Sequence, residues 1–230
     1  MHKPTSSAAS TEKLEQPRKR KLDARATILD AAERLFAERG FEGCTLRDVA
    51  DKAKVNQGMI HYFFKTKETL FREAYVRRGQ VIVDERLRLL DAEEALAGQK
   101  PIPVERLIEL FLRPAIDVAM RGPGGRAFVR MQARLQLESS RFGDHIRRAL
   151  YDDSSRRFVA AFARSLPSLT QDDVCWRFVF MLGTYQYVLA DTGRLEVISD
   201  GRYTGRDFES AFKQMVRFLA AGIQADPINS

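Results

Sequence analysis

Residues 45–68 read TLRDVADKAKVNQGMIHYFFKTKE, and their pattern predicts two short helices joined by a tight turn. Thr45 followed by Asp48 has the spacing of a capping box, so we expect the first helix to begin there. Asn56 is a favourable N-cap for a second helix over residues 57–63. Such a pair is typical of a helix-turn-helix, whose second helix enters the major groove of DNA.

The second helix of this pair has an apolar face and a polar face. Ile60 and Phe64 lie four residues apart and anchor the helix to the protein, so Gln57, Met59 and His61 face outward. Glutamine makes a bidentate hydrogen bond to adenine, and methionine contacts the methyl group of thymine. The outward face therefore carries side chains that read base edges.

A longer amphipathic helix is expected before this pair, over residues 24–39. Its apolar residues follow helical spacing and are Ile28, Ala31, Ala32, Leu35 and Phe36. Gly40 is placed to end the helix with a positive φ. Together, these elements form a small three-helix domain.

Residues 28–70 resemble the TetR family of transcriptional regulators, through ILDAAERLFAERGF, TLRDVADKA and VNQGMIHYFFKTKETL. The family pattern is kept at Gly58, Phe64, Lys67 and Glu68. The chain differs from the family pattern at five positions, and these differences are mild. They are Lys54, Asn56, Ile60, His61 and Phe63. The changes at His61 and Phe63 bear directly on the base and phosphate contacts.

The resemblance implies that Arg47 and Gln57 contact bases and that Lys65 and Lys67 lie near phosphates. The full set of expected DNA-binding residues is Thr45, Arg47, Asn56, Gln57, Gly58, Met59, His61, Tyr62, Lys65 and Lys67. The family also implies a palindromic double-stranded DNA operator and a homodimer, most simply a repressor.

Charge is concentrated at the same end of the chain. The net charge is +7, and residues 1–67 hold 14 Lys and Arg against 9 Asp and Glu. A positive field there favours DNA through counterion release, although runs of charge are often only solvated surface. Residues 1–22, which end in Arg-Lys-Arg-Lys, are expected to form a disordered basic arm. The arm is either a solubilising tail or a segment that reaches DNA beside the bound helix.

Several classes of protein are disfavoured. There is no apolar run of about 18 residues, so we expect no membrane span and a cytoplasmic protein on the bacterial nucleoid. Cys44 and Cys175 form no paired motif, and each is either a small buried hydrophobe or a redox sensor. The histidines are too scattered for a metal site, and the close acidic pairs at 152–153 and 172–173 lack a catalytic constellation. We expect no metal, no cofactor and no enzyme activity.

The rest of the chain is helical in pattern, which predicts an all-α fold. Residues 23–70 form the DNA-binding domain, and residues 71–230 form a domain for effector binding and dimerisation. Helices are expected over 67–97, 104–120 with Pro114 inside, 127–138, 144–166, 172–192 and 207–225. The sequence GPGG at 122–125 predicts a turn. The inner face of the long helix is expected to hold Leu70, Phe71, Ala74, Val81 and Leu89.

Large apolar residues in the second domain either fill an ordinary core or line an apolar cavity. The candidates for a ligand site are Phe111, Phe128, Met131, Leu135, Phe158, Phe162, Phe178, Met181 and Tyr185. A succession of arginines either meets an acyl carboxylate or a coenzyme A phosphate or forms a solvated stripe. These are Arg113, Arg121, Arg126, Arg130 and Arg134, and the last three share a helix face.

Two C-terminal stretches, WRFVFMLG at 176–183 and FLAAGIQAD at 218–226, are similar to fatty-acid-responsive TetR regulators of the PsrA type. That similarity implies a fatty acid or acyl-coenzyme A effector, whereas the residues alone support a small hydrophobic molecule. The family also implies that the last two long helices pair with those of a second copy. The interface or its supporting core is expected at Trp176, Phe180, Phe212, Met215 and Phe218.

Three other functions are kept as alternatives. One is a TetR-type regulator of genes for the efflux or catabolism of drugs and aromatic compounds. The others are a DNA-processing enzyme with a helix-turn-helix and an architectural protein that binds DNA without regard to sequence.

Overall fold

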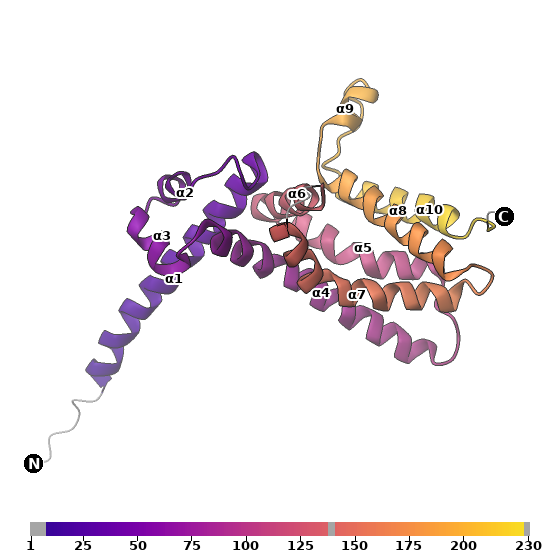
Figure 1. Ribbon diagram of the computed structural model, residues 1–230, viewed down its shortest axis with the longest axis horizontal. Helices are drawn as coiled ribbons and strands as arrows, with labels where there is room; N and C mark the ends of the chain where they lie inside the picture. The colour runs from indigo at the N-terminus through magenta and orange to yellow at the C-terminus, as the bar shows by residue number, and fades with distance from the viewer. Residues whose placement is uncertain (1–7, 138–140, 228–230) are drawn as a thin grey trace, which may run out of the picture. The chain divides into compact units, whose positions relative to one another are not determined.

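The computed structural model describes residues 8–137 and 141–227, and all regular elements in these ranges are α-helices (Figure 1). This confirms the all-α prediction. The helices are α1 Ala8–Arg39, α2 Leu46–Ala53, α3 Gln57–Phe64, α4 Lys67–Ala97, α5 Val104–Met120, α6 Pro123–Leu137, α7 Arg141–Ser165, α8 Gln171–Leu189, α9 Arg194–Ile198 and α10 Phe208–Ile223. Two units are distinguished, Met1–Ala74 and Tyr75–Ser230, and they divide four residues beyond the boundary expected at residue 70.

The N-terminal unit is held together by the apolar faces of α1, α2, α3 and the start of α4. Ile28, Val49, Ile60, Phe64 and Leu70 are fully buried, and they come from all four helices. Full burial of each such side chain contributes roughly 1.5–3 kcal/mol, which is why an eight-residue helix such as α3 is stable here. The predicted anchoring of α3 by residues 60 and 64 is confirmed.

The first helix differs from expectation at its N-terminal end. Residues 1–22 were expected to be a disordered arm, but α1 begins at Ala8 and runs without a break to Arg39. The helix that we placed over residues 24–39 is therefore the C-terminal part of a longer helix. The seven residues before Ala8 lie outside the described part of the chain.

In the C-terminal unit, α5 packs against α6 and α10, and α8 packs against α6, α7 and α10. An aromatic cluster surrounds Phe111 of α5, whose ring centroid lies 5.0 Å from that of Phe158, 5.2 Å from Phe178 and 5.9 Å from Tyr185. All three contacts have edge-to-face geometry, which aromatic pairs favour. This cluster fixes α5, α7 and α8 together around one core.

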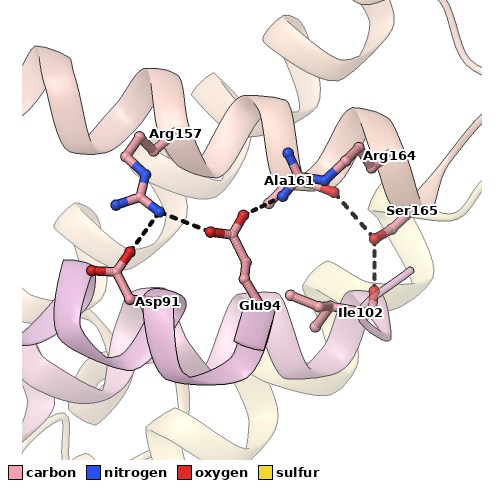
Figure 2. Close-up of polar contacts among 7 residues, drawn as sticks. All are labelled: Asp91, Glu94, Ile102, Arg157, Ala161, Arg164 and Ser165. Carbon is pink, nitrogen blue, oxygen red and sulfur yellow. Dashed lines mark hydrogen bonds and ion pairs between the residues drawn. The ribbon is translucent and has the colours of Figure 1, made fainter. Parts of the chain in front are cut away.

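A group of ion pairs joins the second half of α4 to α7 (Figure 2). Arg157 Nη2 lies 2.6 Å from a carboxylate oxygen of Asp91 and 2.8 Å from one of Glu94, and Glu94 also pairs with Arg164. The Ser165 hydroxyl donates to the Ile102 carbonyl at 2.7 Å. Because Glu94 is shared between two arginines, the contacts form a network rather than isolated surface pairs.

The helix α6 begins earlier than predicted. The GPGG segment was predicted as a turn, but only Gly122 turns, with φ 91°, and α6 already begins at Pro123. Proline is favoured at the first position of a helix, where its missing N–H has no helical partner. Gly125 then permits close packing, because a Cβ there would lie 1.8 Å from the Val118 carbonyl oxygen.

The first part of the inner face of α4 is as predicted, since Leu70, Phe71 and Ala74 are buried, but the second part is shifted by one position. Val81, which we expected to be buried, is 45% exposed, whereas Ile82, Arg86 and Leu90 are buried. These three residues are spaced four apart and follow one face of the helix. The shift brings a charged residue into the core.

Candidate nucleic-acid interface and ligand cavity

The first helix of the helix-turn-helix begins with the predicted capping box. The backbone N–H of Asp48 donates to the Thr45 hydroxyl at 3.1 Å, and the Thr45 N–H donates to the Asp48 carboxylate at 2.8 Å. The hydrogen bond from the Thr45 hydroxyl, followed by the one from its backbone N–H, lowers the pKa of Asp48 below its usual value. A charged carboxylate in the first turn also suits the helix dipole.

The turn between α2 and α3 is closed by a lysine in a left-handed conformation. Lys54 has φ 56° and ψ 42°, at the position where the family pattern has glycine. Asn56 then caps α3, because its side-chain oxygen accepts a hydrogen bond from the Met59 N–H at 2.9 Å. Gly58 lies in the first turn of α3, where a Cβ would lie 3.2 Å from that same oxygen. The turn therefore fixes the direction of α3 relative to α2.

The exposed face of α3 holds most of the residues expected to contact DNA. Gln57, Gly58, His61 and Tyr62 are exposed, and Met59 is half-buried. Four further residues of the expected DNA-binding set lie outside α3 and are also exposed. They are Thr45, Arg47, Asn56 and Lys65. The geometry thus brings one polar, hydrogen-bonding surface to the outside of a rigidly capped helix.

The two lysines at the end of α3 are held differently from each other. Lys65 has φ 61°, and its carbonyl oxygen lies 3.3 Å from Nδ1 of His61. Lys67 is half-buried, and its ammonium lies 4.3 Å from the centre of the Phe41 ring. This cation–π contact fixes the position of the Lys67 charge near the start of α4.

Cys44 does not have the features of a redox sensor. Cys44 is buried, and its burial, followed by the nearby Asp48 carboxylate, raises the pKa of its thiol to about 11. A protonated thiol is a poor nucleophile. Cys175 is exposed and unpaired.

A cavity of about 300 Å³ lies in the C-terminal unit. Its lining comes from α4, α5, α7 and α8 and consists of Arg86, Phe111, Asp144, Arg147, Arg148, Tyr151, Asp152, Ser155, Leu182, Tyr185 and Gln186. The residues from α4 and α5 are buried, whereas Arg148 is exposed. The cavity therefore leads from the surface of α7 into the core.

Arg86 is the buried charge in this lining. It is 1% exposed, its Nε donates to the Phe111 carbonyl at 2.7 Å, and its guanidinium lies 3.7 Å from the centre of the Phe111 ring. Its Nη2 is buried and has no hydrogen-bond partner among the described residues. A guanidinium has five N–H donors, so this buried group retains an unused donor beside the cavity.

Polar side chains beside Arg86 form two short hydrogen-bonded groups. Tyr151 donates to the Tyr75 hydroxyl at 3.1 Å and accepts from Gln132 at 2.9 Å. Gln186 donates to the Tyr185 hydroxyl at 2.6 Å, while its own carbonyl oxygen is buried without a partner in the described chain. Burial raises the pKa of both Tyr75 and Tyr151, so both phenols are neutral.

The candidates for the ligand site are all placed, but few line this cavity. Phe111 and Tyr185 do, and Phe178 lines a neighbouring surface pocket. The other six apolar candidates are buried and are Phe128, Met131, Leu135, Phe158, Phe162 and Met181. Arg130 is half-buried, Arg134 is exposed, and neither belongs to the cavity lining.

The sequence reasoning missed Arg86, Tyr151, Leu182 and Gln186. A signal for Arg86 did exist, because a charged residue midway between Ile82 and Leu90 on an apolar stripe is exceptional. We missed it because the stripe was assigned to the positions of Val81 and Leu89.

An apolar surface runs along α8 and onto α10. Trp176, Val179, Phe180 and Tyr187 of α8 are exposed, as is Phe218 of α10, and the two helices pack side by side (Figure 1). Gly183 of α8 and Gly222 of α10 have open space around them. Phe212 and Met215, which were expected at the interface or in its supporting core, are buried within the chain.

The described residues contain neither a membrane-spanning helix nor a metal-binding cluster. No helix there is long and apolar enough to cross a membrane. Likewise, no group of three or more His, Cys, Asp or Glu side chains in the described ranges is arranged to hold a metal ion.

Comparison with known proteins yields two family models. Residues 28–74 match the model described as bacterial regulatory proteins, tetR family, and residues 109–222 match the tetracyclin repressor-like C-terminal domain. Similar curated proteins include the HTH-type transcriptional repressor NicS of Pseudomonas putida, 38% identical over 76 residues, or 31% of this chain and 36% of that protein. The probable acrEF/envCD operon repressor of Escherichia coli K12 is 32% identical over 91 residues, or 40% of this chain and 39% of that protein. These alignments span less than half of each relative.

Similar solved structures extend over most of the chain. The hemolysin II transcriptional regulator HlyIIR has a TM-score of 0.61 at 17% identity and covers 87% of this chain and 98% of its own. A putative fatty acid metabolism regulator of Clostridium perfringens has a TM-score of 0.59 at 23% identity and covers 89% of this chain and 100% of its own. At these identities, the likeness establishes a shared fold.

Proposed function

The chain belongs to the TetR family of bacterial regulators, and from that premise we propose that it is a homodimeric repressor released from DNA by a small molecule. The observation that carries this proposal is the capped α2–α3 pair. Its turn is fixed by Lys54 and Asn56, and α3 exposes Gln57, His61 and Tyr62 beside basic residues. Such a surface suits base edges and phosphates in a major groove.

Dimerisation is proposed through the exposed apolar surface of α8 and α10. Phe218 is 70% exposed and Trp176 is 63% exposed, which is unusual for large apolar side chains unless another surface covers them. Gly183 and Gly222 leave room for a second helix to approach closely. Two copies of α3, related by a two-fold axis, would then read the two halves of a palindromic operator.

The effector is proposed to enter the cavity beside Phe111 and Tyr185. Ligand binding there shifts the population toward a conformation whose α3 helices no longer fit both half-sites, provided that the ligand prefers that conformation. Fatty acids are the favoured class of effector for two reasons. The C-terminal stretches are similar to PsrA-type regulators, and the Clostridium perfringens protein of similar fold is a putative regulator of fatty acid metabolism.

A second candidate is a regulator of the efflux or catabolism of aromatic compounds. The aromatic lining by Phe111, Tyr151 and Tyr185 favours it, since flat rings stack well on such walls.

Selection of bound duplexes from random DNA, followed by competition, tests the proposal. We expect the selected palindrome to bind on the order of 10³-fold more tightly than random DNA, as specific regulators do. Equal affinity for both would instead indicate an architectural protein. Magnesium-dependent nicking of the bound DNA would indicate an enzyme, and small molecules that co-purify with the protein, identified by mass spectrometry, would separate the two effector classes.

A further inference from the structure

Arg86 is a buried cation without an anion. Buried charges in proteins are nearly always paired, because an uncompensated one is strongly destabilising. The two carboxylates that line the same cavity are engaged elsewhere: Asp144 pairs with Arg147, and Asp152 pairs with Arg156 at 3.4 Å. Among the described residues, none supplies a carboxylate to Arg86.

The surroundings of Arg86 hold its guanidinium in a fixed orientation. Nε is hydrogen-bonded to the Phe111 carbonyl, one face lies against the Phe111 ring, and the Tyr185 ring centroid lies 5.6 Å away. These contacts use the aromatic faces and one donor, while the buried Nη2 remains unpaired. A preorganised donor of this kind binds an anion without losing side-chain entropy.

Gln186 supplies a second, adjustable group at the same cavity. Its side-chain oxygen is buried without a partner, while its amide nitrogen donates to Tyr185. If the amide turned end for end, the Tyr185 hydroxyl would donate to its oxygen, and its N–H groups would be free to donate to an anion. The cavity can therefore satisfy all of these buried polar groups at once when an anion is present.

We propose that Arg86 and Gln186 bind the carboxylate of a compact monocarboxylic acid, and that this acid is the effector. The inference rests on the proposed function and narrows its effector class. A cavity of about 300 Å³ is at the small end of the range for ligand pockets, so the ligand is compact. Its apolar body contacts Phe111, Leu182 and Tyr185. This corresponds to a medium-chain acid such as octanoate.

The same geometry argues against the arginines that the sequence suggested. Arg130 and Arg134 lie on α6 and are absent from the cavity lining, and Arg113 is already paired with Asp117 at 2.7 Å and Glu209 at 2.8 Å. Arg130 does have a buried Nε without a partner among the described residues, which makes it the proper competitor for Arg86.

Isothermal titration of the full chain with octanoate, octanamide, octyl phosphate and hexadecanoate tests the proposal. We expect octanoate to bind at least about tenfold more tightly than octanamide, because a hydrogen bond to a charged group is lost in the amide. Octanoate is also expected to bind more tightly than octyl phosphate and hexadecanoate. Equal binding of octanoate and octanamide, tighter binding of octyl phosphate or of hexadecanoate, or no binding of octanoate would each overturn the proposal.

Three variants identify the residue. Arg86→Met should abolish the preference for octanoate over octanamide without lowering the melting temperature, because it removes an unpaired buried charge. Arg86→Lys should keep part of the preference, and Arg130→Met should keep all of it. The assignment to Arg86 is wrong if Arg130→Met loses the preference while Arg86→Lys retains it in full. If Arg86→Met fails to fold, the comparison of ligands on the unaltered protein and the lysine variant still decides the question.

Operator binding, measured on the same preparations, tests the proposed function separately from the carboxylate site. Failure of the ligand-free protein to bind its selected palindrome would contradict the proposed function. The titration decides the carboxylate site independently, since it contains no DNA.

Discussion

The Lys21 ammonium lies 3.5 Å from the Tyr62 hydroxyl oxygen and 5.5 Å from the centre of the Tyr62 ring. Lys21, the last residue of the basic run at 18–21, thus contacts the exposed face of α3. It makes this contact from within α1 rather than from a disordered arm. Tyr62 remains exposed, so both side chains are accessible to DNA.

The first prediction concerns this contact. If Lys21 neutralises a phosphate, Lys21→Ala should weaken binding to all DNA sequences alike and should reduce the slope of log affinity against log salt by about one. Fluorescence anisotropy over a range of salt concentrations measures both effects. Tyr62→Phe is the matched control: it removes the hydroxyl but keeps the charge, so its salt slope should equal that of the unaltered protein. An unchanged slope for Lys21→Ala would remove Lys21 from the phosphate contacts.

The second prediction concerns base readout by Gln57, which is exposed in the first turn of α3. Gln57→Ala should cost about 1–3 kcal/mol on the selected operator and should relax the preference at one base pair in each half-site. Repeating the DNA selection with the variant measures this preference directly. The assignment fails if the variant binds the operator and its base-substituted forms with the same affinity ratios as the unaltered protein.

The two helices that form the DNA-binding surface were predictable because their signals are local. Thr45, Asp48 and Asn56 make the same hydrogen bonds that their spacing predicts, and each bond spans only three residues. The apolar residues of α3 are likewise fixed by a four-residue repeat. Such features depend on neighbouring side chains and need no knowledge of the rest of the fold.

The ligand cavity was not predictable, because it depends on how four helices meet. A shift of one residue in the assigned face of α4 put Val81 and Leu89 in the places of Ile82 and Leu90, so Arg86, which lies between Ile82 and Leu90 on the same face, was passed over. Adjacent positions lie about 100° apart around a helix, but each contested position here has an apolar neighbour, Val81 beside Ile82 and Leu89 beside Leu90, so apolar spacing alone does not choose between the two faces. Whether Phe158 lines a cavity or fills a core is likewise decided by tertiary packing, and here it fills the core.

The third prediction concerns the left-handed Lys54. A non-glycine residue in this conformation costs roughly 1–2 kcal/mol relative to glycine, so Lys54→Gly should stabilise the protein by about 1 kcal/mol. Thermal and chemical unfolding measure this change. Lys52→Gly is the control, because Lys52 lies within α2 and glycine there should destabilise by about 1 kcal/mol. Destabilisation by Lys54→Gly would show that the lysine side chain contributes more than its backbone costs.

The last prediction concerns assembly, and it depends on the difference between Phe218 and Phe212 on α10. Phe218 is exposed and Phe212 is buried in a single chain. Phe218→Glu should therefore leave each chain folded but weaken the dimer by about 2 kcal/mol or more, as expected for a large interface residue. Phe212→Glu should instead destabilise the C-terminal unit, because it removes a buried ring and its contact with Arg113 and takes a carboxylate out of water. Analytical ultracentrifugation with circular dichroism distinguishes these outcomes. Operator affinity should fall with dimer affinity, since one α3 reaches only one half-site, and an unaltered protein that sediments as a monomer at micromolar concentration would contradict paired recognition altogether.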